Sequence, residues 1–133
     1  MRITVDTNFL ISATQWNYSV AHKLLKILIE KEIKIFATKE ILGEFSDVLQ
    51  RDFKYAKDEA GSLIEKLLFI IELSYPANKI DIIKEDPADN KIIECAVATG
   101  SKFILTYDRH LLKHKEYENI KIITPEEAMK LWQ

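Results

Sequence analysis

Four acidic residues in separate parts of the chain have the types and positions needed to hold a divalent metal ion. Asp6 ends a short apolar stretch, and Asp108 follows a second one. Glu44 and Asp89 each fall near the start of an expected helix. Mg²⁺ and Mn²⁺ prefer carboxylate oxygens, and ions of this kind activate water and stabilise the leaving oxygen of a phosphodiester. These residues therefore predict metal-dependent hydrolysis of a phosphodiester.

Each acid also has a purely structural interpretation. Asp6 can close a strand as a turn residue, and Asp108 can cap a short helix. Asp86 and Asp89 suit a helix start, for which Asp86 is the preferred cap, and Glu44 alone would be an ordinary exposed residue.

Four carboxylates at one place repel, since two charges about 4 Å apart cost roughly 4 kcal/mol at an effective dielectric near 20. A hard cation removes this conflict, and the lack of His or Cys in the set disfavours zinc.

The apolar pattern predicts alternating strands and helices. Strands are expected at 2–6, 33–38, 80–83, 102–106 and 120–123. Helical periodicity is found at 20–30, after Thr38, at 56–73, from the segment 85–90 onward and after Thr124-Pro125. This order predicts a mostly parallel sheet with helices on both faces. The carboxyl ends of parallel strands and the N-termini of the connecting helices meet at one edge, where the four acids would gather.

The totals fit one domain over residues 1–133. The chain is 47% hydrophobic and 30% charged, has one cysteine and carries a net charge of −2. This balance is typical of a globular protein, excludes an internal disulfide and does not indicate nucleic-acid binding by bulk charge. Local cations near the acidic edge would have to hold phosphates; the candidates are Lys102, Arg109 and Lys113. No signal-peptide pattern or bilayer-length apolar run is evident, so a cytoplasmic protein without a membrane segment is expected.

Four segments resemble the PIN-domain family, the nuclease fold of VapC-type toxins. They are VDTNFLISA (5–13), EILGEFSDVL (40–49), DPADNKIIECAVATGSKFILTYDRHLL (86–112) and IKIITPEEAM (120–129). The resemblance implies a three-layer α/β/α fold with a five-stranded sheet and a Mg²⁺- or Mn²⁺-dependent ribonuclease. The acidic site carried over by position is Asp6, Glu44, Asp89 and Asp108. Supporting positions are Thr7, Asn8 and Thr106, of which Asn8 would brace the loop by hydrogen bonds.

The resemblance further implies a homodimeric toxin that acts on RNA and is silenced by an antitoxin protein. Two positions depart from the family pattern: Tyr107 stands where glycine is common, and His110 where a second acid is often found. Tyr107 would narrow the site or stack on a base, and His110 would contact a phosphate or lie on the surface.

Two other functions are weighed against the ribonuclease. A phosphatase of the haloacid-dehalogenase type needs a second aspartate two residues after the first, where this chain has Asn8. A non-catalytic RNA-binding or scaffold PIN module would be expected to lose acids, whereas all four positions are filled. The sequence therefore favours a metal-dependent endoribonuclease.

Overall fold

The computed structural model describes residues 1–76 and 90–132, so the predicted strand at 80–83 and both Asp86 and Asp89 lie outside the described residues. The strands are β1 (Arg2–Val5), β2 (Lys34–Thr38), β3 (Ile71–Ser74), β4 (Phe103–Leu105), β5 (Glu116–Tyr117) and β6 (Ile120–Ile123). The helices are α1 (Thr7–Gln15), α2 (Val20–Glu30), α3 (Lys39–Asp52), α4 (Lys57–Leu67), α5 (Asn90–Thr99), α6 (Arg109–Leu112) and α7 (Pro125–Trp132).

The strands form one sheet in the order β3-β2-β1-β4-β6-β5. All neighbours are parallel except β5, which pairs antiparallel with β6. The predicted mostly parallel sheet is confirmed, but the described sheet has six strands where five were expected. The unforeseen β5 is only two residues long, and Glu118 and Asn119 connect it to β6 with positive φ angles. So short a strand carries too few residues to show an alternating pattern.

The helix predicted over 56–73 is wrong in its last part. Helix α4 ends at Leu67, and Ile71 begins β3, where it pairs with Ile35 of β2. A run of apolar residues fits both a helical face and a buried strand, so periodicity alone cannot separate the two. Pairing with β2 decides the matter, because it buries Ile71 to 2% exposure and satisfies its backbone.

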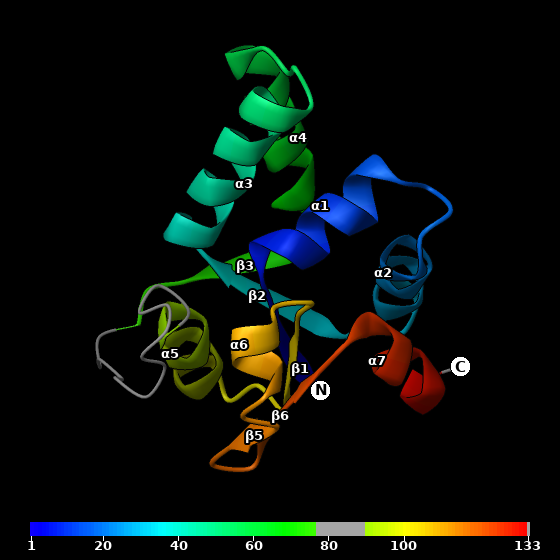
Figure 1. Cartoon of the computed structure of the whole chain (residues 1–133), viewed down its shortest axis with the longest axis vertical. Coiled ribbons are helices and arrows are strands. Elements are labelled where there is room, and N and C mark those ends of the chain that lie inside the picture. Colours follow the sequence, from blue (N-terminus) through cyan, green and yellow to red (C-terminus); the bar gives the residue numbers. More distant parts are fainter. Residues whose placement is uncertain (77–89, 133) are drawn as a thin grey trace.

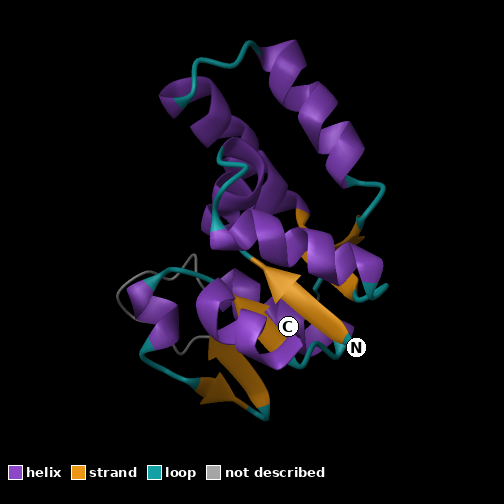
Figure 2. Cartoon of the chain, turned by 90° about the vertical axis from the view of Figure 1, so that its right-hand side faces the viewer, coloured by secondary structure: helices purple, strands orange, loops and turns teal. Residues whose placement is uncertain are grey.

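Helices cover both faces of the sheet, as predicted. Helix α5 packs against β1, β2, β3 and β4, whereas α1 packs with α2, and α2 with α7. Figure 1 shows α5 and α6 on one side of the sheet and α1 and α2 on the other. Crossovers between parallel strands are right-handed, so the direction in which the chain moves along the sheet decides which face a connecting helix covers. Here the chain moves from β1 outward to β3 and then returns to β4, so the helices fall on both faces. Figures 1 and 2 show α3 and α4 as a helical pair that extends beyond the sheet.

The core lies against the central strand. Ile3 and Val5 of β1 are fully buried, and so are Phe9 of α1 and Phe45 of α3. A central position for β1 places its carboxyl end in the middle of one edge of the sheet. Among the described residues, no helix is long and apolar enough to cross a membrane.

Candidate active site

Asp6 is a buried carboxylate at the carboxyl end of the central strand. Its side chain is the N-cap of α1, where Oδ1 accepts a hydrogen bond from the Phe9 amide at 2.9 Å. Oδ2 accepts a hydrogen bond from the Thr106 hydroxyl, and the residue is only 3% exposed. The same residue therefore ends the strand and starts the helix, which explains why a carboxylate can lie between two apolar segments.

Thr106 joins the ends of β1 and β4. Its fully buried hydroxyl donates to Asp6 and accepts a hydrogen bond from the Asp108 amide at 2.9 Å. Its own amide donates to the carbonyl of Ile123 at 3.1 Å, which fixes it against β6. One side chain thus sets the position of two of the predicted acids relative to each other.

Asp108 lies half-buried after β4, where it caps α6. Its Oδ1 accepts a hydrogen bond from the His110 amide at 2.8 Å, and the His110 ring lies 3.7 Å from the same oxygen. The side chain of Asp108 is 24% exposed. A carboxylate held by its own helix while partly open to solvent has a free edge for a ligand.

Glu44 reaches the same edge from α3. Thr38 caps this helix by accepting from the Ile41 amide at 3.1 Å, and the Thr7 hydroxyl donates to the Ile41 carbonyl at 3.2 Å. These contacts tie the first turn of α3 to the start of α1, next to Asp6. Glu44 itself is exposed.

The three described acids share one electrostatic environment. Burial raises the pKa of Asp6 from 3.8 to about 6, against the hydrogen bonds from Thr106 and Phe9, which lower it. The negative charges of Asp108 and Glu44 are smaller contributions to the same rise in the pKa of Asp6. A bound cation would oppose both effects, because it favours the ionised carboxylate.

The fourth predicted acid, Asp89, lies outside the described residues. Within the described part of the chain, no three His, Cys, Asp or Glu side chains form a group that could hold a metal ion. The described acids therefore supply only part of the predicted ligand set. Asn90, which is buried at 4% exposure where α5 begins, was not singled out from the sequence. The signal in the sequence that could have drawn attention to Asn90 is its position directly after Asp89 in DPADN (86–90).

Two positions, Thr7 and Asn8, were predicted to shape the loop after β1, and among the described residues only the Thr7 side chain makes a hydrogen bond there. Thr7 is buried and bonds to α3, as described above. Asn8 is exposed, and its side chain makes no hydrogen bond to the described residues, so the predicted bracing role is not seen there. Residue 8 is on the solvent side of the first turn of α1, because the helix turns its neighbours Thr7 and Phe9 inward.

Comparison with known proteins bears on this arrangement. The sequence profile of the family described as "PIN domain" matches residues 2–110. The chain belongs to the PIN-domain family. Among solved structures, the fold is similar to a chain from "VapBC2 from Rickettsia felis bound to a DNA fragment from their promoter", at 17% identity and a TM-score of 0.65. That match covers 93% of this chain and 98% of the other. No curated protein matches the chain.

Three cations were expected near the acidic edge of this PIN domain. Arg109 directly follows Asp108 and is exposed, and Lys113 is exposed at the C-terminal end of α6. The expectation for Lys102 was wrong. Lys102 precedes β4, and its amide donates to the Arg2 carbonyl at the start of β1, so it lies at the opposite edge of the sheet. Lys102 and Thr106 stand at the two ends of the segment KFILT. The strand between them places these two residues at opposite edges of the sheet.

Tyr107 occupies the position where glycine is common in the PIN-domain family, and its hydroxyl contacts helix α7. The hydroxyl donates to Glu126 of α7 at 3.2 Å, and the ring is half-buried against the core. Burial first, and then the charge of Glu126, raise the pKa of the phenol, so Tyr107 remains neutral. This contact anchors the strand end between Thr106 and Asp108 to the first turn of α7.

Proposed function

We propose that this PIN domain is a Mg²⁺- or Mn²⁺-dependent endoribonuclease. The observation that carries the proposal is the buried Asp6 carboxylate, whose pKa is raised to about 6 beside two further acids. Keeping such a group at the edge of a sheet costs stability unless a cation compensates for it. Asp6, Glu44, Asp89 and Asp108 would hold the ion, directly or through water.

The side chains would divide the work according to their burial. Asp6 is fixed by Phe9 and Thr106 and would be the rigid ligand. Asp108 is fixed by its amide and its cap, with an edge left open to the solvent. Glu44, being exposed, would orient the attacking water and accept its proton. The bound ion would lower the pKa of that water and stabilise the leaving oxygen.

RNA is the proposed substrate, and its phosphates would need cations beside the acids. Arg109 adjoins Asp108 and can bind a phosphate with two parallel hydrogen bonds, and Lys113 lies four residues further on. The corrected position of Lys102 removes it from this role.

We further propose that the protein is the toxin of a toxin–antitoxin pair, acts in the cytoplasm and forms a homodimer. The supporting observation for an antitoxin is the likeness in fold to a chain of the VapBC2 assembly. The segment of an antitoxin that entered the acidic edge would compete with RNA.

Cleavage of mixed RNAs tests the proposed activity. Wild-type protein should cut RNA with Mn²⁺ and not with EDTA, and Asp6→Asn should lower the rate by about 100-fold or more, since it removes the central ligand. Asp58→Asn is the matched control, because Asp58 is an exposed acid in the first turn of α4. Activity that survives EDTA, or that Asp6→Asn leaves unchanged, would contradict the proposal.

The runner-up is a non-catalytic RNA-binding or scaffold module of the same family. It predicts that the wild-type protein binds RNA, measured by fluorescence anisotropy, and cuts none with either metal. The filled positions Asp6, Glu44 and Asp108 favour the enzyme.

A further inference from the structure

Two aromatic side chains are exposed in the short loop between α1 and α2. Trp16 is 39% exposed, and Tyr18 is 74% exposed. Single exposed apolar residues are normal, but two aromatic rings in one loop offer flat faces on which other rings can stack. Neither ring belongs to the acidic edge of the sheet, so the proposed metal site gives no reason for their exposure.

The loop that carries these rings is held in one position. The Trp16 ring packs edge-to-face against Phe53 at the end of α3, with 5.6 Å between the ring centroids. The Ser19 amide donates to the Trp16 carbonyl at 3.1 Å, and the Ser19 hydroxyl donates to the Ser12 carbonyl at 2.8 Å. A ring that is already fixed loses little conformational entropy when it binds a ligand.

Helices α1 and α3 connect this loop to the acidic edge. They contact each other at their first turns, where Thr7 donates to Ile41 at 3.2 Å, and at their far ends through Trp16 and Phe53. Glu44 precedes Phe53 by nine residues, which corresponds to about 14 Å along a helix. About four nucleotides span this distance at a rise of roughly 3.4 Å each. An RNA strand cut at the acidic edge therefore reaches the two rings within a few nucleotides.

Lys54 adds a positive charge next to the contact between Trp16 and Phe53. It directly follows Phe53, is exposed, and forms no ion pair with another described residue. Asp52, the acid on the other side of Phe53, is already paired with Arg51 at 2.9 Å. Exposed aromatic rings with an uncompensated cation beside them are the combination that binds single-stranded nucleic acid.

We infer that Trp16 and Tyr18 bind unpaired RNA by stacking on its bases, with Lys54 beside its phosphates. This binding mode rests on the proposed ribonuclease function, which makes RNA the ligand, and it restricts the substrate to single strands. The bases of a duplex are stacked on one another, so only an unpaired strand can place its bases on the two rings.

Fluorescence anisotropy with a labelled oligoadenylate of about 12 nucleotides tests the role of the rings. Binding is measured in EDTA, so that the RNA stays intact. Tyr18→Ala should raise the dissociation constant about tenfold, and Trp16→Ala by at least as much, because each removes a stacking surface. Trp16→Phe should keep most of the affinity, since it retains a ring against Phe53.

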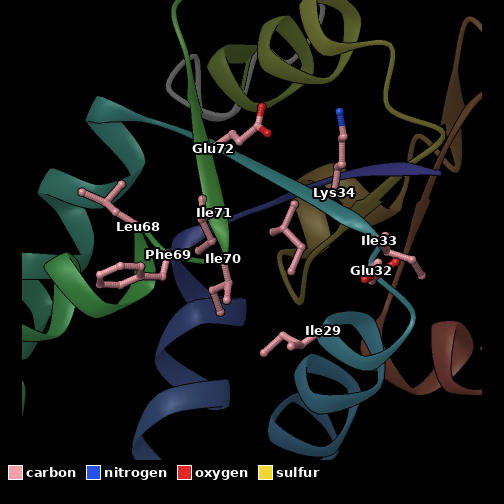
Figure 3. A pocket seen from close by; sticks show the side chains of 10 residues that line it. Ile29, Glu32, Ile33, Lys34, Leu68, Phe69, Ile70, Ile71 and Glu72 are labelled. Carbon is pink, nitrogen blue, oxygen red and sulfur yellow. The ribbon is translucent and has the colours of Figure 1, made fainter.

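Phe69→Ala is the matched control for the loss of an exposed ring. Phe69 is 89% exposed at the turn between α4 and β3, beside the recess shown in Figure 3 and before the amino end of β3. It therefore lies at the edge of the sheet opposite the acids. Phe69→Ala should leave the affinity for oligoadenylate unchanged.

Lys54→Gly separates the charge of this residue from its place in the fold. Lys54 has a φ angle of 59°, a left-handed conformation that favours glycine at the end of a helix. The variant should therefore be at least as stable as wild type in urea. It should nevertheless bind oligoadenylate about fivefold more weakly and with a smaller dependence on salt. A purely structural Lys54 would give no change in affinity.

Duplex RNA of the same length gives a contrasting expectation, because Tyr18→Ala should leave its affinity unchanged. Equal losses of affinity for duplex and single strand would overturn the inference, and so would single-strand binding that Tyr18→Ala and Trp16→Ala both leave intact. Circular dichroism should show Tyr18→Ala folded, since this side chain is exposed. A protein that binds oligoadenylate through these rings and cuts no RNA would support the stacking surface and contradict only the ribonuclease.

Discussion

At the scale of single residues, Asp6 shows a conflict between stability and chemistry. The carboxylate is buried and raised in pKa, although Phe9 and Thr106 each donate a hydrogen bond to it. Hydrogen bonds from neutral groups offset only part of the cost of burying a charge. The residue is thus placed where an ion would compensate most, which is the reason to expect function at this position.

The pH dependence of stability tests this account. Folded Asp6 keeps its proton up to about pH 6, whereas the unfolded chain loses it near 3.8, so folded protein binds more protons between these values. The free energy of unfolding should therefore fall as pH rises through that window, by an amount of roughly 3 kcal/mol at most. Asp6→Asn should be more stable than wild type at pH 8 in EDTA and equal to it below about pH 4.

Urea unfolding at pH 4, 6 and 8 provides the measurement. Asp58→Asn, at an exposed position, should show no such pH-dependent gain. If Asp6→Asn proved less stable than wild type at pH 8, Asp6 would be a purely structural cap, and the conflict described above would not exist.

At the scale of elements, strand ends and helix starts coincide around the site. Asp6 follows β1 and caps α1, Thr38 ends β2 and caps α3, and Asp108 caps α6 soon after β4. Each cap satisfies a free amide of its helix, so three helix N-termini are fixed at the carboxyl edge of the sheet. The N-terminal ends of these helices also favour negative charge, which lowers the cost of gathering acids there.

Removing the cap of α3 should lower both the stability of the protein and its affinity for Mn²⁺, whereas removing the cap of another helix should lower the stability alone. Thr38→Ala should cost about 1 kcal/mol and weaken Mn²⁺ binding about tenfold, because α3 carries Glu44. Ser19→Ala removes the cap of α2, where Ser19 accepts from the His22 amide at 3.1 Å, and should cost a similar amount of stability without changing the affinity. Calorimetric titration with Mn²⁺ and urea unfolding measure the two quantities. Equal effects of both variants on Mn²⁺ affinity would show that α3 has no special role.

At the scale of the whole molecule, the fold assembles acids that are distant in the chain. Asp6 and Asp108 are about a hundred residues apart in sequence, yet Thr106 contacts both. A ligand that binds only this assembled edge binds the folded state alone, and it should therefore stabilise the entire domain.

Mn²⁺ should raise the melting temperature of the protein only where the acidic site around Asp6 is intact. At a concentration 100 times the dissociation constant, the gain should be about 2.7 kcal/mol. That corresponds to roughly 10 °C for a chain of this size. Differential scanning fluorimetry should show the shift in wild type and in Asp58→Asn, and little of it in Asp6→Asn. An equal shift in all three proteins would place the bound metal elsewhere.

The sequence by itself determined the class of fold and which acids deserved attention. Apolar alternation and helical periodicity predicted β6 and α2 at their observed bounds, because these segments bury one clear face each. The capping residue Thr38 was also visible, since its effect is local. Asp6 could be recognised from a polar residue that ends an apolar stretch.

Only the tertiary structure decided where non-local contacts compete with local preference. Ile71 fits a helical pattern but pairs with β2, and Lys102 lies across a strand from the edge it was assigned to. Thr106 was singled out as a supporting position, but its hydrogen bonds to both Asp6 and Asp108 could not be read from the chain, since they depend on strands brought together by the sheet. Periodicity records which side of an element is buried, whereas its partners are set by sheet order and crossover direction.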